Sequence, residues 1–298
     1  MKIQRLLMLL FATMMISVSC GAVGVQKAKN STTEEGEIIQ GDTIAVKSES
    51  MKRSIKNTVI VPAQYFDSEL QDEQYPVVYL LNGYSGDYAS WCKIKPELDD
   101  ISSEMGVIIV CPDGQDSWYW DSPIDKNMQF ETYITKELVP YIDNNYRTIP
   151  EAKLRAITGL SMGGHGGLWL AMRHPDIFGV AGSTSGGVDI ASFPDKWKTK
   201  ERLGDYASNK GSWKTHSVMS LVPTLKKGQL KIIFDCGSGD FFIAVNNKLH
   251  EALLQKGIDH DYIVRPGGHT FQYWNNSIDY QLLFFQKAFE EADAAKAN

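Results

Sequence analysis

Basic clusters and cysteines are both scarce in this sequence, and each shortage excludes a class of protein. Among the 298 residues, 30 are lysine or arginine and 36 are aspartate or glutamate, so the formal charge is −6. No run of basic residues appears, so the electrostatic footprint of nucleic-acid binding is missing and we expect no nucleic-acid partner. With 43% hydrophobic and 22% charged residues, the composition is that of an ordinary globular protein, and we expect one large domain.

The 4 cysteines do not have the spacing of a metal site. Cys20 lies near the N-terminus, and Cys92, Cys111 and Cys236 form an odd set in which at most one disulfide could form. We interpret these three as small buried hydrophobic residues near strand ends. No metal and no cofactor is expected.

Long apolar runs are also scarce, and the run from Leu6 to Val18 is short for a membrane span. It follows two basic residues and precedes small ones, which predicts a secretory signal peptide over residues 1–22. Cys20 stands where a lipoprotein signal carries its lipidated cysteine, although Ser17 replaces the usual leucine. We therefore expect an exported protein, either periplasmic or held at the outer membrane by a lipid anchor on Cys20.

The rest of the chain predicts an α/β domain over residues 49–292, after a flexible polar leader over residues 23–48. Strands bounded by glycine alternate with helices, which indicates a mostly parallel central sheet with helices on both faces. Between about residues 186 and 228 no strand pattern appears, and we expect a small helical cap insertion there. Strands are expected within residues 57–65, 75–83, 106–114, 154–161, 180–186, 230–240 and 260–269, and helices within residues 95–104, 128–146, 168–178, 242–257 and 277–291.

The stretch ITGLSMGGHGGLWLAMRHP concentrates glycines around one serine. Ser161 is the centre of a Gly-x-Ser-x-Gly pattern that runs from Gly159 to Gly163, between a predicted strand and a predicted helix. This arrangement is typical of the nucleophile elbow of the α/β-hydrolases, where glycines let strand and helix approach closely. We predict Ser161 as a nucleophile.

A serine nucleophile needs a base and an acid, which in this fold follow it along the chain in the order acid, then histidine. Of the 6 histidines, only His269 follows the last predicted strand, in a loop that could reach Ser161. For the acid, Asp240 lies in the loop beyond its predicted strand and Asp235 lies at the strand end. The loop position favours Asp240, and Asp235 is the alternative.

The oxygen of an attacked carbonyl also needs hydrogen-bond donors. We expect one from the backbone N–H of Met162, which starts the helix after the nucleophile. The second candidate is the backbone N–H of Tyr84, in the loop after an earlier strand.

Five stretches together resemble one known family, the putative esterases, which includes S-formylglutathione hydrolases, feruloyl and acetyl-xylan esterases, and bacterial mycolyltransferases. These stretches are YPVVYLLNGYSGDYASW, CPDGQDSWYWDSP, GLSMGGHGGLWLAMRHPDIFG, FDCGSGDFF and PGGHTFQYW. The resemblance implies an α/β-hydrolase fold with Ser161, Asp240 and His269 as triad, and Met162 and Tyr84 as oxyanion donors. Asn82 departs from the pattern, since many relatives have histidine before the glycine.

The sequence therefore predicts a secreted serine esterase acting on feruloyl or acetyl esters of carbohydrate, either as small molecules or linked to polysaccharide. Aromatic residues near the site suggest a platform for sugar or phenolic rings. Trp120 is the first choice for substrate contact, with Trp118 and Trp274 as further candidates. The alternatives are an acyltransferase, a thioesterase like S-formylglutathione hydrolase, and a non-catalytic carbohydrate-binding protein on the same scaffold.

Overall fold

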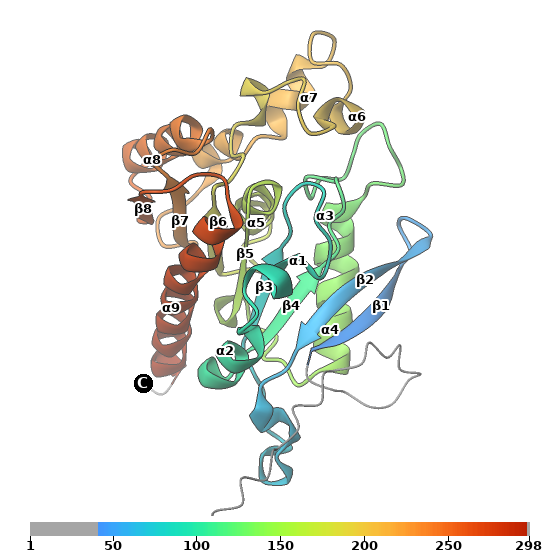
Figure 1. The fold of residues 1–298 in the computed structure, drawn as a ribbon, viewed down its shortest axis with the longest axis vertical. Helices are drawn as coiled ribbons and strands as arrows, with labels where there is room; N and C mark the ends of the chain where they lie inside the picture. Colours follow the sequence, from blue (N-terminus) through green and yellow to red (C-terminus); the bar gives the residue numbers. More distant parts are fainter. Residues whose placement is uncertain (1–40, 297–298) are drawn as a thin grey trace, which may run out of the picture. The chain divides into compact units, whose positions relative to one another are not determined.

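The structure is a computed structural model that describes residues 41–296 (Figure 1). The signal peptide expected over residues 1–22, with Cys20, lies outside the described residues, as does most of the leader expected over residues 23–48. No helix between residues 41 and 296 has the length and apolarity that a membrane crossing requires.

A central sheet of eight strands confirms the predicted α/β-hydrolase architecture. The strand order is β1-β2-β4-β3-β5-β6-β7-β8, with β3 to β8 parallel, β2 antiparallel to its neighbour β4, and β1 antiparallel to β2. The inner strands are apolar and buried along their whole length, as expected for strands covered on both faces. The strands are β1 Asp42–Ser48, β2 Arg53–Ile60, β3 Val77–Leu81, β4 Ile108–Pro112, β5 Arg155–Gly159, β6 Val180–Thr184, β7 Lys231–Gly237 and β8 Asp261–Arg265.

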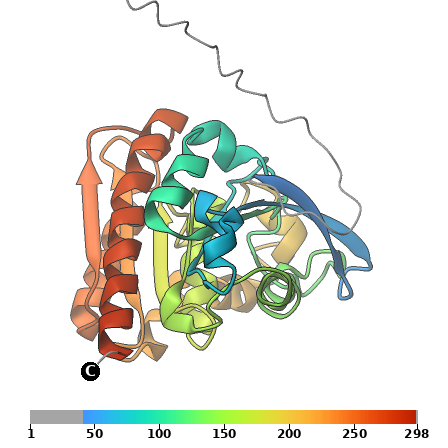
Figure 2. The same ribbon diagram turned by 90° about the horizontal axis from the view of Figure 1, so that it is seen from below.

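Helices cover both faces of this sheet (Figures 1 and 2). One face is packed by α1 Ser90–Ile94, α2 Leu98–Met105 and α9 Phe271–Lys296. The other carries α3 Phe130–Thr132, which continues through a π-helical segment Tyr133–Leu138 into α4 Val139–Asn145, together with α5 Met162–Arg173 and α8 Ile243–Lys256. Each face therefore has its own hydrophobic core, separated by the sheet.

The insertion after β6 is helical, as predicted. Between residues 186 and 228 it contains α6 Thr199–Leu203, α7 Lys210–Thr215 and three short 3-10 turns, and no strand. Figure 1 shows α6 and α7 beyond the same end of the sheet as the loop that precedes α5. This cap is therefore placed beside the loops at the carboxyl ends of the parallel strands.

One sequence prediction of local structure was wrong, and two predicted helices begin at other residues than expected. Residues 42–48, assigned to the flexible leader, form β1, whose pairing with β2 runs from Asp42 opposite Val59 to Ser48 opposite Arg53. The helix expected over residues 95–104 is α2 and begins three residues later, at Leu98, because the proline at position 96 disfavours a helical conformation at the residue before it. The last helix begins six residues earlier than residue 277, at Phe271.

The three cysteines of the described chain carry free thiols. Cys111 and Cys236 are buried in β4 and β7, and Cys92 is half-buried in α1. Cys111 and Cys236 are therefore buried near strand ends, as predicted, whereas Cys92 is a helix residue and the prediction was wrong for it.

Candidate active site

The carboxyl ends of four parallel strands carry the residues that the sequence singled out. Ser161 follows β5, Asp240 follows β7 and His269 follows β8, while Tyr84 lies in the loop after β3. Because these strands are parallel neighbours in one sheet, their following loops meet at a single edge. Residues far apart in the sequence are brought together at this edge.

Ser161 occupies a strained turn between β5 and α5. Its backbone has φ 56° and ψ −112°, a region that residues other than glycine rarely adopt. The turn is tight enough that a Cβ atom on Gly163 would lie 2.2 Å from the carbonyl oxygen of Leu81. The glycine after the serine is therefore required by the close approach of α5 to β3, and the turn presents the Ser161 hydroxyl at the sheet edge.

His269 contacts both partners that the sequence assigned to it. Its Nε2 lies 2.9 Å from Oγ of Ser161, and its Nδ1 lies 2.9 Å from Oδ2 of Asp240. The Asp240 side chain is fully buried, and its second oxygen accepts a hydrogen bond from the backbone N–H of Phe242. This geometry lets His269 take a proton from Ser161 while Asp240 orients the ring.

Asp235, the alternative acid, serves a different network. Its carboxylate accepts hydrogen bonds from Thr184, Ser277 and Gln281, and burial raises its pKa. These contacts join β7 to β6 and α9, and they do not include His269. Asp235 therefore holds the sheet to the last helix rather than facing Ser161.

Two backbone amides beside Ser161 have no acceptor within the chain from residue 41 to residue 296. The N–H groups of Met162 and Tyr84 donate to no described backbone or side-chain oxygen. Met162 is the first residue of α5, where N–H groups point out of the helix. Amides that are free beside a nucleophile can bind the negative oxygen that develops on an attacked carbonyl.

A cavity of about 660 Å³ opens at this edge and includes Ser161 and His269. Trp274, a predicted contact residue, lines it and packs edge-on against the His269 ring at 4.9 Å. Besides Tyr84, whose backbone N–H is described above, the other aromatic walls are Trp197 from the cap, Phe241 beside Asp240, and Phe271 at the start of α9. Sequence reasoning missed these three, although Phe241 and Phe271 flank the loops that carry the predicted acid and base.

Trp118 and Trp120, the other predicted contact residues, do not reach this cavity, and that prediction was wrong. Both are fully buried. The loop after β4 turns inward with positive φ at Trp118, so the two indoles stack on each other and Trp120 packs edge-on against His165 of α5. They fill the space between α5 and the cap, which leaves no face for a substrate.

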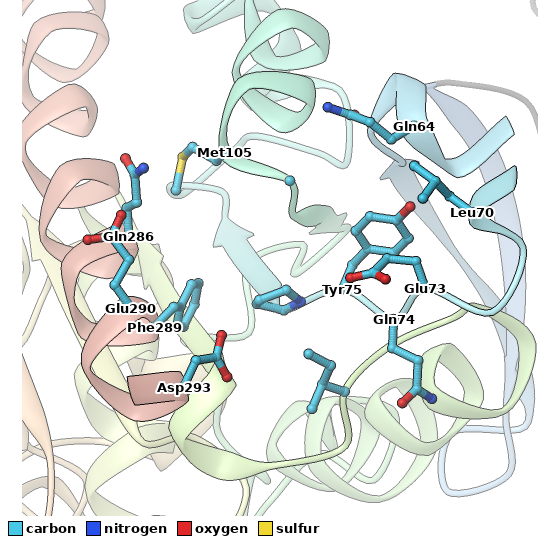
Figure 3. Close-up of a pocket in the computed structure, with 13 residues that line it drawn as sticks. Gln64, Leu70, Glu73, Gln74, Tyr75, Met105, Gln286, Phe289, Glu290 and Asp293 are labelled. Atoms are coloured by element: carbon cyan, nitrogen blue, oxygen red, sulfur yellow. The ribbon is translucent and has the colours of Figure 1, made fainter. Parts of the chain in front are cut away.

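A second cavity, of about 530 Å³, lies at the opposite ends of the strands (Figure 3). Tyr75 and Met105 from the segments before β3 and β4 line it with Phe289 and Asp293 of α9. None of the residues that converge on Ser161 is there. Within residues 41–296 no group of three histidine, cysteine or acidic residues could hold a metal ion.

Both the sequence and the fold are similar to those of known proteins. Residues 48–285 match the family described as "Putative esterase". An acetyl esterase of Caldicellulosiruptor saccharolyticus is 29% identical over 75% of this chain and 90% of its own, and an S-formylglutathione hydrolase of Bos taurus is 25% identical over 67% and 82%. Among solved structures, a ferulic acid esterase superposes with a TM-score of 0.70 at 25% identity, covering 84% of this chain and 100% of its own.

Proposed function

The chain belongs to the esterase family that its sequence matches over residues 48–285 and is a carboxylic ester hydrolase, and from this premise we propose that it is a serine esterase for acyl groups carried on carbohydrate. The observation that carries the proposal is the chain of hydrogen bonds that joins Asp240 to His269 and His269 to Ser161. A protein that only binds carbohydrate has no need of this arrangement, so the contact favours catalysis.

The proposed reaction proceeds in two halves. Oγ of Ser161 attacks the ester carbonyl while Nε2 of His269 takes its proton, and the amides of Met162 and Tyr84 bind the oxygen that becomes negative. His269 then returns the proton to the leaving alcohol, which departs and leaves an acyl group on Ser161. Water repeats the sequence on this acyl group, and the free acid and the serine are released.

The substrate class is proposed from the walls of the cavity. Trp197 and Phe241 stack with ring centroids 5.7 Å apart and an interplanar angle of 20°, and Phe241 and Phe271 are more than half exposed. Exposed aromatic faces beside a nucleophile suit a phenolic acyl group or a sugar ring. The names of two relatives, acetyl esterase and ferulic acid esterase, support acetyl and feruloyl groups as the candidates.

Export is the third part of the proposal, and it rests on the sequence before residue 23. A signal peptide would place the enzyme outside the cytoplasm, where polysaccharide esters are found. Intact-mass analysis of protein from the native envelope tests this part. Cleavage near Cys20 to Val23, with or without a lipid-sized increment on Cys20, is expected, and soluble cytoplasmic protein that retains Met1 would overturn it.

Turnover assays on three substrates test the activity. We expect wild-type enzyme to hydrolyse methyl ferulate or acetylated xylo-oligosaccharide with a higher kcat/KM than S-formylglutathione, and Ser161→Ala to hydrolyse none of them. If S-formylglutathione is the preferred substrate by tenfold or more, the carbohydrate proposal is wrong and the thioesterase alternative replaces it. Product analysis with a sugar acceptor present distinguishes hydrolysis from acyl transfer.

A further inference from the structure

Asn82, the residue that departs from the family pattern, begins the loop that carries Tyr84. It is 1% exposed and follows the last residue of β3. We propose that Asn82 is a positioning residue, whose side-chain amide holds the peptide group between Gly83 and Tyr84 so that the Tyr84 N–H faces Ser161. The inference rests on the proposed function, because it assigns a role in the same oxyanion site.

The orientation of the Asn82 amide is settled by its neighbours. The backbone N–H of Gly114 donates to Oδ1 at 2.8 Å, and the hydroxyl of Tyr119 donates to the same atom at 2.9 Å. A backbone N–H can only donate, so the atom that it contacts must be the oxygen. Burial raises the pKa of Tyr119, so its hydroxyl keeps its proton and stays a donor. The Nδ2 group of Asn82 therefore faces the carbonyl of Gly83, at 2.9 Å.

This contact fixes the direction of the next amide. A trans peptide group is planar, with its C=O and N–H pointing in opposite directions. The carbonyl of Gly83 accepts from Nδ2 of Asn82 and from the backbone N–H of Gly86 at 3.0 Å, so its direction is held by two donors. The N–H of Tyr84 must then point away from Asn82, and Gly83, Tyr84 and Ser161 line the same cavity.

The carbonyl of Gly83 needs a donor, and Gly114 and Tyr119 need an acceptor. The asparagine side chain supplies both. Without Nδ2, the Gly83 carbonyl would keep one of its two donors and the peptide group could rotate. Rotation would turn a carbonyl oxygen toward the site in place of the N–H, which would repel the developing oxyanion instead of binding it. Asn82 never touches substrate in this account, and it acts only through the peptide group.

The substitution Asn82→Asp tests the inference with almost no change of shape. It keeps the acceptor for Gly114 and Tyr119 but puts an oxygen opposite the Gly83 carbonyl. At pH 8 we expect kcat for p-nitrophenyl acetate to fall about 10- to 100-fold, with KM within about twofold, because the lost interaction is made in the transition state. As the pH is lowered the introduced carboxyl group protonates and regains a donor, so the kcat ratio of wild type to variant should shrink.

Two further variants keep the test decisive. Tyr119→Phe is the matched control, because it removes a donor from the same Asn82 oxygen and leaves the Nδ2 contact in place, so kcat should stay within about threefold of wild type. Asn82→Ala removes the donor without adding charge, and should lose kcat as Asn82→Asp does but without recovery at low pH. If the Asn82→Asp variant fails to fold, Asn82→Ala still tests whether the Nδ2 contact is needed for catalysis.

Two results would overturn the inference. One is a folded Asn82→Asp or Asn82→Ala enzyme with kcat within threefold of wild type at pH 8. The other is a loss in Tyr119→Phe as large as that in Asn82→Asp, which would indicate a general packing role. An inactive wild-type enzyme, or an active Ser161→Ala variant, would instead refute the proposed function, so the two failures are distinguishable.

Discussion

The Nε2 atom of His269 lies 2.9 Å from the hydroxyl oxygen of Ser161, although 108 positions separate them in the chain. His269 follows β8 at the edge of the sheet, and Ser161 follows β5 near its middle. The backbone N–H of Gly239 donates to Gly267 at 2.8 Å, which ties the Asp240 loop to the His269 loop. A backbone contact thus holds the loops of the acid and the base together, and the order of the strands brings the base to Ser161.

Substitution of Asp240 should reduce activity, whereas substitution of Asp235 should reduce stability. Asp240→Asn removes the acceptor that orients His269, and we expect kcat for p-nitrophenyl acetate to fall by about 10³- to 10⁴-fold with little change in Tm. Asp235→Asn places an amide among the donors of Ser277 and Gln281, and should destabilise the fold by about 1–3 kcal/mol while kcat changes less than tenfold. Kinetics and thermal unfolding of both variants check the assignment. The opposite ranking of the two kcat values would move the acid to Asp235.

Trp197 should select substrate, whereas Trp120 should stabilise the fold. Trp197→Ala removes a wall of the cavity, so KM for methyl ferulate should rise about 5- to 30-fold, a cost of about 1–2 kcal/mol, while KM for methyl acetate stays within twofold. Trp120→Ala removes a fully buried indole, and we expect about 3–5 kcal/mol of destabilisation. Equal effects of Trp197→Ala on both esters would mean that Trp197 supports the cap and does not contact the acyl group.

His165 should make the protein less stable in acid. Burial lowers its pKa from 6.5 to about 3, and its Nδ1 contacts the carbonyl of Gly187. Between those values the unfolded chain binds a proton that the folded chain does not, so stability falls as the pH decreases below about 6.5. From pH 7 to pH 5 the loss due to His165 should be about 2 kcal/mol.

Urea unfolding at both pH values measures this loss, with His165→Gln as the comparison. The glutamine variant has no proton to gain, so its stability should change less than that of the wild type by about that amount. His216 also has a pKa lowered by burial and contributes with the same sign in both proteins. Identical pH dependence in the two proteins would show that His165 protonates without penalty.

Asp240 and His269 could be identified from the sequence because the order of the strands is enough to bring their loops to Ser161. The order of strands fixes which loops share the sheet edge, and the loops after β5, β7 and β8 could be recognised from glycine positions. The direction of individual side chains was not accessible in the same way. Trp274 lies in α9 and lines the cavity, whereas the loop after β4, with positive φ at Trp118 and Tyr119, turns Trp118 and Trp120 into the core.

The β1 strand and the role of Asn82 were missed for a related reason. The segment from Asp42 to Ser48 does not alternate between apolar and polar residues, and its pairing with β2, rather than its own pattern, makes it a strand. Asn82 is held by Gly114 and Tyr119, which come from a different loop. Contacts between distant loops leave no signal in the local sequence.

The site at which a fluorophosphonate attaches tests the central claim most directly. A serine that a neighbouring base activates attacks such a reagent far faster than an ordinary hydroxyl does, and the product mimics the oxyanion. Peptide mass spectrometry of the labelled enzyme should find one adduct, on Ser161, formed in step with the loss of p-nitrophenyl acetate hydrolysis and absent from Ser161→Ala. An adduct on another residue that accompanies the loss of activity, or full activity after Ser161 is labelled, would contradict the account.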